Sequence, residues 1–135
     1  MTPAALPAFL PSFLIDTHVL LWLDEAPERL SEHIQGLLRD PKHVVYCSAA
    51  SLWEIAIKQS VGKLQIKGTL PSLLDQYGFT ELPVTARYAE LTRALPMHHR
   101  DPFDRMLVAQ AMTEQLVLIS ADRQMLAYEV AILSC

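Results

Sequence analysis

The stretch SFLIDTHVLLWLDE, residues 12–25, gives the clearest indication of the fold class. Its first five residues form a short apolar run that ends in the carboxylate of Asp16, which is typical of a buried strand. A helix is expected to follow at once, with Thr17 near its cap. A strand that is apolar on both faces belongs in a parallel sheet with helices on both sides.

The rest of the chain continues this alternation of strands and helices. Further strands are expected at 43–48 and 116–120, with shorter extended segments at 79–85 and 130–134. Helices are expected at 27–40, 48–61, 69–77, 86–95, 102–115 and, after a turn, within 121–129. This order predicts a three-layer α/β/α domain with a mainly parallel central sheet.

Length and charge limit the classes of function. The chain has 135 residues, enough for one domain, which is expected to span 12–135 after a proline-punctuated arm at 1–11. The net charge of −4 argues against a generic basic nucleic-acid binder, but not against an enzyme that reaches phosphates through divalent cations. Only Cys47 and Cys135 are cysteines, so a cytoplasmic location without a disulfide framework is expected.

Four carboxylates are expected at one edge of the sheet. Asp16 ends the first strand, Glu54 lies early in the helix after the second strand, and Asp122 follows the strand at 116–120. In an open α/β sheet, ligands bind beyond the carboxyl ends of the strands. Asp104 opens the helix that leads into the strand at 116–120, and a short loop would bring it to the same edge.

Each carboxylate also has an ordinary structural explanation. Asp16 could cap the following helix, and Glu54 could complete a capping box with Ser51. Asp104 could complement the helix dipole behind the N-cap Asp101 and Pro102, a contribution of about 0.3–1 kcal/mol. Asp122 could be a turn residue.

The four together are harder to explain in this way. Like charges about 4 Å apart repel by roughly 4 kcal/mol per pair at an effective dielectric near 20. A cluster without matching cationic side chains is therefore expected to bind divalent cations, and all-oxygen ligands suit Mg²⁺ or Mn²⁺ better than zinc. Such ions can support phosphodiester cleavage.

Four segments give the sequence a family resemblance. LIDTHVLLW, SLWEIAIKQSVGKL, LPMHHRDPFDRMLVAQA and LVLISAD occur in this order. Over residues 13–128 they resemble PIN-domain ribonucleases, specifically the VapC-type toxins of toxin–antitoxin pairs. The resemblance implies a Mg²⁺-dependent endoribonuclease that a small antitoxin inhibits. The acidic quartet of the family falls on Asp16, Glu54, Asp104 and Asp122. Ser120 takes the position of a small hydroxyl residue that supports the fourth carboxylate.

Other side chains near these motifs have alternative roles. His98 and His99 could bind a metal or a phosphate, although a loop pair with local hydrogen bonds is the simpler interpretation, and His18 could line the cleft or pack. Three arginines could position phosphates or pair with the carboxylates: Arg100, Arg105 and Arg123. Lys58 and Lys63 are expected on a solvated helix face. Trp22 and Trp53 could stack on unpaired bases, but burial in the core or in an oligomer contact is favoured.

The sequence therefore predicts a metal-dependent endoribonuclease with Asp16 and Asp104 as direct ligands. The alternative is a catalytically inert PIN-like module that binds protein or RNA. A homodimer is also expected, through the helix that follows Asp16 or the helix that ends in LLRD.

Overall fold

The centre of the molecule is a five-stranded sheet in which neighbouring strands all run parallel. A computed structural model describes residues 11–128 and 131–134. Along the sheet the strand order is β3-β2-β1-β4-β5. The bounds are Phe13–Ile15 for β1, Val45–Ser48 for β2, Thr80–Leu82 for β3, Val117–Ser120 for β4 and Ile132–Ser134 for β5.

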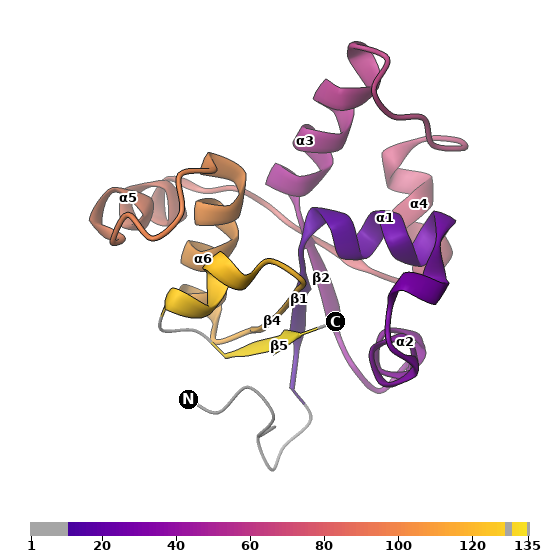
Figure 1. The fold of residues 1–135 in the computed structure, drawn as a ribbon, viewed down its shortest axis with the longest axis horizontal. Helices are drawn as coiled ribbons and strands as arrows, with labels where there is room; N and C mark the ends of the chain where they lie inside the picture. Colours follow the sequence, from indigo (N-terminus) through magenta and orange to yellow (C-terminus); the bar gives the residue numbers. More distant parts are fainter. Residues whose placement is uncertain (1–10, 129–130, 135) are drawn as a thin grey trace.

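Helices cover both faces of this sheet, which confirms the three-layer prediction (Figure 1). Their bounds are Thr17–Glu25 for α1, Glu32–Arg39 for α2, Ala49–Ser60 for α3, Leu70–Tyr77 for α4, Ala86–Ala94 for α5 and Pro102–Glu114 for α6, with 3-10 turns η1 at Pro27–Arg29 and η2 at Arg123–Ala127.

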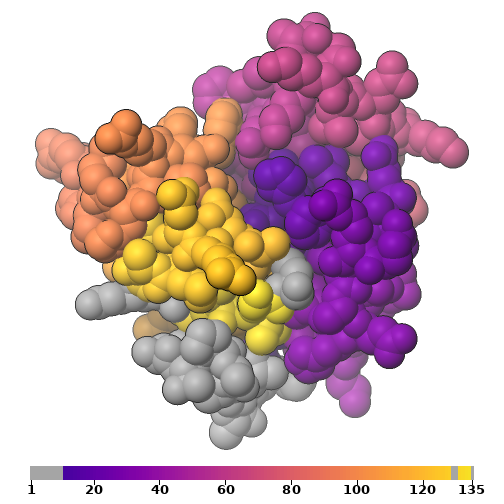
Figure 2. Space-filling view, in the orientation of Figure 1, coloured from indigo at the N-terminus to yellow at the C-terminus, as the bar shows by residue number. Residues whose placement is uncertain are grey.

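Alternation along β1 separates two apolar clusters. Phe13 and Ile15 join a cluster with buried side chains of α1, α2, α3 and α4. Leu14 points to the other face and packs with Leu107 of α6. Figure 2 shows the resulting halves, with the orange α5–α6 part on the left and the indigo-to-pink α1–α4 part on the right.

One predicted helix is wrong at its start. Residues 27–40 do not form a single helix, because η1 ends at Arg29 and α2 begins at Glu32. Ser31 has an extended backbone, and its Oγ accepts a hydrogen bond from the backbone N–H of Ile34. Ser31 is thus an N-cap that separates the two segments, and Leu30 reaches the core from outside α2.

The strand order has its switch point between β1 and β4. After β1 the chain turns to the α1 face, whereas Met125 of η2, after β4, packs on the α6 face. Strand order reverses at this point, and ligands of open α/β sheets bind at such switch points. Asp16 and Asp122 follow the two strands that flank this switch point.

The helices of the described residues are all too short or too polar to cross a membrane. The predicted arm at 1–11 and Cys135 lie outside the described residues, except for Pro11. Cys47 is buried as a free thiol on β2.

Candidate metal centre

Asp16 is both a helix cap and a buried carboxylate. Its Oδ1 accepts a hydrogen bond from the backbone N–H of Val19 at 2.9 Å, so Asp16, and not Thr17, caps α1. Its Oδ2 accepts a hydrogen bond from the hydroxyl of Ser120 at 2.5 Å. Only 4% of Asp16 is exposed, and this burial raises its pKa above the ordinary value despite both hydrogen bonds.

Asp104 and Asp122 meet at the same side chain, His99. The Nε2 atom of His99 lies 3.0 Å from Oδ2 of Asp104 and 2.8 Å from Oδ2 of Asp122. One ligand atom from each of the three residues falls within 4.8 Å of the others, a spacing that a single cation can bridge. The imidazole distinguishes this group from the all-oxygen set that was predicted.

The two aspartates have opposite pKa shifts. Burial raises the pKa of Asp104 to about 7, and the nearby charges of Asp101, Asp16 and Asp122 add to this effect, while His99 opposes it. Burial also acts on Asp122, but hydrogen bonds from the backbone of Gln124 and from His99 outweigh it and lower the pKa. Asp16 is therefore close enough to both aspartates for their charges to interact.

Glu54 contacts Thr17 and Lys58 and not the group around His99. Its Oε1 accepts a hydrogen bond from the Thr17 hydroxyl at 2.6 Å, and its Oε2 lies 3.5 Å from Nζ of Lys58. The predicted capping box with Ser51 is wrong, because Ser48 caps α3 and Ser51 lies inside the helix. Thr17, next to Asp16, connects Glu54 to the carboxyl end of β1.

Asp101 is the N-cap of α6, as predicted. Its Oδ1 accepts hydrogen bonds from the backbone N–H groups of Phe103 and Asp104. For Arg105, the alternative of pairing with a carboxylate is not what the structure shows. Its guanidinium donates to the backbone carbonyl of Thr92 in α5 and to three carbonyls of the segment between α5 and α6. Among the described residues, no lysine or arginine forms an ion pair with Asp16, Asp104 or Asp122.

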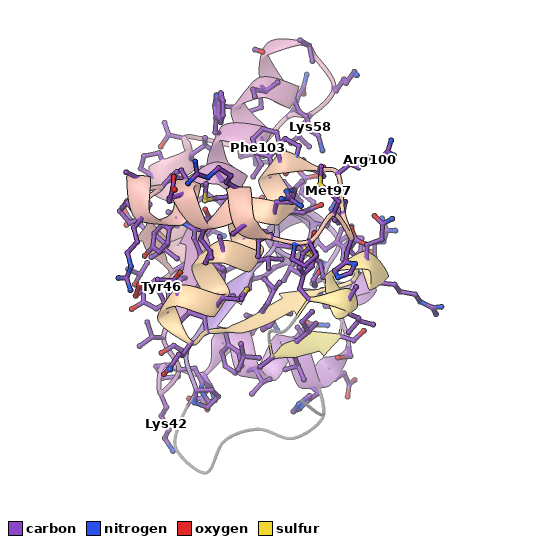
Figure 3. All side chains as sticks on the ribbon, turned by 90° about the vertical axis from the view of Figure 1, so that its left-hand side faces the viewer. Lys42, Tyr46, Lys58, Met97, Arg100 and Phe103 are labelled. Carbon is purple, nitrogen blue, oxygen red and sulfur yellow. The ribbon has the colours of Figure 1, made fainter. Side chains whose placement is uncertain are left out.

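An apolar groove is lined in part by Trp53 and Phe103, the residues that precede Glu54 and Asp104 in the sequence. Its volume is about 560 Å³, and its lining comes from α3, α6 and the segment after β3: Ala49, Ala50, Trp53, Val84, Pro102, Phe103 and Met106. Trp53 is 64% exposed and meets the Phe103 ring edge-on at 5.6 Å between centroids. Trp53 is therefore not in the core, and burial in an oligomer contact stays a prediction. Figure 3 shows Phe103, Lys58, Met97 and Arg100 at the end opposite Lys42, which precedes β2.

The family of the chain follows from its sequence as well as from this geometry. The sequence model described as PIN domain matches residues 13–131, and the chain therefore belongs to the PIN domain family. This confirms the predicted resemblance. No curated protein has a significantly similar sequence.

Solved structures share the fold. VapBC2 from Rickettsia felis, bound to a promoter DNA fragment, has a TM-score of 0.69 at 14% identity, covering 91% of this chain and 98% of its own. FitAcB from Neisseria gonorrhoeae has a TM-score of 0.63 at 21% identity, covering 90% and 96%. DNA-bound VapBC from Salmonella typhimurium has a TM-score of 0.61 at 16% identity, covering 94% and 98%.

Sequence reasoning did not single out two residues of the site. Thr17 was expected only near a helix cap. His98 and His99 were considered together as a pair that could bind a metal or a phosphate, with a loop pair as the simpler interpretation, whereas the structure leaves His98 exposed and brings only His99 to the carboxylates. The His-Arg-Asp-Pro order placed His99 close to Asp101 and Asp104, but its contact with Asp122 spans 23 residues. No local pattern encodes that contact.

Proposed function

We propose that this protein is a divalent-cation-dependent endoribonuclease and acts as the toxin of a toxin–antitoxin pair. The observation that carries the proposal is the convergence of Asp104 and Asp122 on one point, with Asp16 beside them and no cationic partner from the described lysines and arginines. Asp16 is buried and Asp104 and Asp122 are partly buried, and like charges this close together repel unless a cation compensates them. PIN-domain membership and the fold shared with toxin–antitoxin complexes support the same function.

The proposed ligands are Asp16, Asp104 and Asp122, with Glu54 completing the site. Carboxylate oxygens suit Mg²⁺, and Mn²⁺ would substitute for it. When bound, a divalent cation would neutralise the negative charge of the phosphodiester and lower the pKa of the attacking water. The residues of this chain contribute by position: Asp16 and Asp104 begin rigid helices, and Thr17 keeps Glu54 oriented.

The raised pKa of Asp104 is consistent with this assignment. A carboxylate with a pKa of about 7 holds a proton near neutrality in the absence of a cation. A divalent cation favours the ionised form and would displace that proton. Cation binding is therefore expected to release protons near neutral pH, which calorimetry in buffers of different ionisation enthalpy measures.

The partner is proposed to be a small antitoxin that covers the groove around Trp53. Large exposed apolar side chains continue along α3 from Trp53 through Ile57, 40% exposed, to Val61, 61% exposed. Contiguous apolar surface of this kind marks a protein contact. Co-expression with the product of the adjacent reading frame tests the pair. Size-exclusion chromatography of the free chain tests the expected homodimer, and fractionation of the cells tests the expected cytoplasmic location.

The decisive experiment is cleavage of single-stranded RNA by the purified chain. Cleavage is expected with Mg²⁺ or Mn²⁺, to stop in EDTA and to be lost in Asp104→Asn, while circular dichroism shows an unchanged fold. Glu114→Gln, at the opposite end of α6, is the matched control. Full activity of Asp104→Asn, or cleavage that persists in EDTA, would reject the proposal. RNA or protein binding without any cleavage would instead support the inert module.

A further inference from the structure

His99 contacts two of the proposed ligands through a single atom. Its Nε2 lies 2.8 Å from Asp122 and 3.0 Å from Asp104, and 11% of its side chain is exposed. Such an atom can either bind the cation itself or hold the two carboxylates in place. The first role requires a bare Nε2, and the second requires a proton on it.

The other ring nitrogen distinguishes these roles. Nδ1 of His99 accepts a hydrogen bond from the backbone N–H of Asp101 at 3.2 Å. An accepting nitrogen carries no proton, so the proton of the neutral ring is on Nε2 and points at the carboxylates. A histidine that ligates a metal usually donates a hydrogen bond from its second nitrogen. In His99 the second nitrogen, Nδ1, instead accepts from the backbone N–H of Asp101. This arrangement argues against metal ligation through Nε2.

The loop that carries His99 is fixed from two sides. The guanidinium of Arg105 donates to the phenol oxygen of Tyr128 and to four backbone carbonyls, those of Thr92, Leu95, Pro96 and His99. The Tyr128 hydroxyl accepts from the His99 backbone N–H at 3.0 Å and donates to the Pro96 carbonyl at 2.9 Å. These hydrogen bonds fix the position of the His99 ring relative to α6, which contains Asp104, and to η2, which Asp122 precedes.

We propose that His99 is a positioning residue that holds the carboxylates of Asp104 and Asp122 together for the cation by donating its Nε2–H. His99 is not itself a ligand. This inference rests on the proposed metal-dependent function and adds to it a residue outside the acidic quartet. Outer partners of this kind typically change metal affinity about 10–100-fold when they are removed.

The test is calorimetric titration of the purified chain with MnCl₂ and with MgCl₂. Three variants are compared with the wild type. His99→Gln keeps an N–H donor near the position of Nε2, His99→Leu removes it, and His98→Gln changes the exposed neighbouring ring as a matched control. We expect His99→Leu to lower the affinity for Mn²⁺ and for Mg²⁺ about tenfold or more, by the same factor for both cations. The affinities of His99→Gln should stay within about threefold of those of the wild type.

A spectroscopic measurement gives a second readout on the unmodified protein. Electron spin echo envelope modulation of bound Mn²⁺ is expected to show no coupling to a directly ligated nitrogen. Such a coupling would overturn the inference, and so would wild-type affinity in His99→Leu or equal losses in His99→Gln and His99→Leu. A wild type that binds neither cation would overturn the proposed metal dependence itself, which distinguishes that failure from failure of the His99 assignment alone.

Discussion

Ser120 donates a hydrogen bond to Asp16 across the β1–β4 pair, although 104 residues separate them in the chain. The same hydroxyl oxygen accepts a hydrogen bond from the backbone N–H of Asp122 at 3.0 Å. One buried side chain therefore fixes the first and the last of the four predicted carboxylates relative to each other. The expected supporting role of Ser120 toward Asp122 is thereby extended to Asp16.

Removal of this hydroxyl tests the connection. Ser120→Ala leaves Oδ2 of Asp16 without the donor that lowers its pKa, so the pKa of Asp16 is expected to rise further. The free energy of unfolding should fall by about 1–3 kcal/mol, the cost of an unsatisfied buried group. Chemical denaturation measures this, with Ser134→Ala, the exposed register partner of Ser120 on β5, as the control. An equal loss in both variants would contradict the prediction.

The raised pKa of Asp104 predicts how stability depends on pH without metal. The folded-state pKa is about 7 against an ordinary value of 3.8, so the folded protein holds this proton more tightly than the unfolded chain. The resulting stability is complete below pH 3.8 and is lost as the pH rises through 7. In EDTA, Tm of the wild type should therefore fall over this range relative to that of Asp104→Asn, which cannot ionise.

Differential scanning calorimetry at several pH values measures the difference between the two proteins. Addition of Mg²⁺ is expected to raise the wild-type Tm near pH 7 and to leave Asp104→Asn nearly unchanged. A constant Tm difference across the pH range would contradict the raised pKa.

The contact between Thr17 and Glu54 predicts a positioning effect. Thr17→Val keeps the shape of the buried side chain but removes the donor to Oε1 of Glu54. RNA cleavage should fall about tenfold, since the proposed site loses the orientation of its fourth carboxylate. Thr17→Ser keeps the hydroxyl and should keep the activity. Steady-state kinetics measures both variants, and equal activity of Thr17→Val and Thr17→Ser would reject the role of the hydrogen bond.

Exposure of Trp53 predicts a large effect on partner binding and a small one on stability. Trp53→Ala removes an aromatic side chain from the groove and should weaken the antitoxin complex at least about thirtyfold, as for a central aromatic contact. Tm of the free chain should change little because 64% of Trp53 is exposed. Leu126→Ala is the control, as Leu126 is 50% exposed on η2. Surface plasmon resonance measures the affinities, and undiminished binding would place the partner elsewhere.

The strand–helix order of the fold was predictable because β1, β2 and β4 are short, largely apolar runs that lead into a polar residue, whereas β3 carries two exposed polar residues and was expected only as an extended segment. The places of Asp16, Asp104 and Asp122 in the fold were predictable for the same reason, since each lies just after a strand or in the first turn of a helix. The environment of Glu54 was not. A serine three residues earlier suggested a local cap, whereas its hydrogen-bond partner is Thr17, 37 residues away.

Arg105 shows the same limit on sequence reasoning. Its position beside Asp104 suggested a contact with phosphate or carboxylate, because the sequence shows the charge of the side chain but not the acceptors within its reach. In the folded chain its terminal nitrogens are directed at carbonyls near the end of α5 and in the loop that follows. Which acceptors a guanidinium reaches depends on the path of the loop, and that path depends on Tyr128 far along the chain.

The strand order also determines when the site can form during synthesis. Asp16 and Glu54 are translated early, whereas Asp104 and Asp122 belong to the last third of the chain. The second edge of β1 can pair only after Val117–Ser120 has been synthesised. A nascent or prematurely terminated chain that ends before α6 holds only half of the carboxylates. If the proposed ribonuclease function is right, such a fragment would not cleave RNA, and activity would require completed translation.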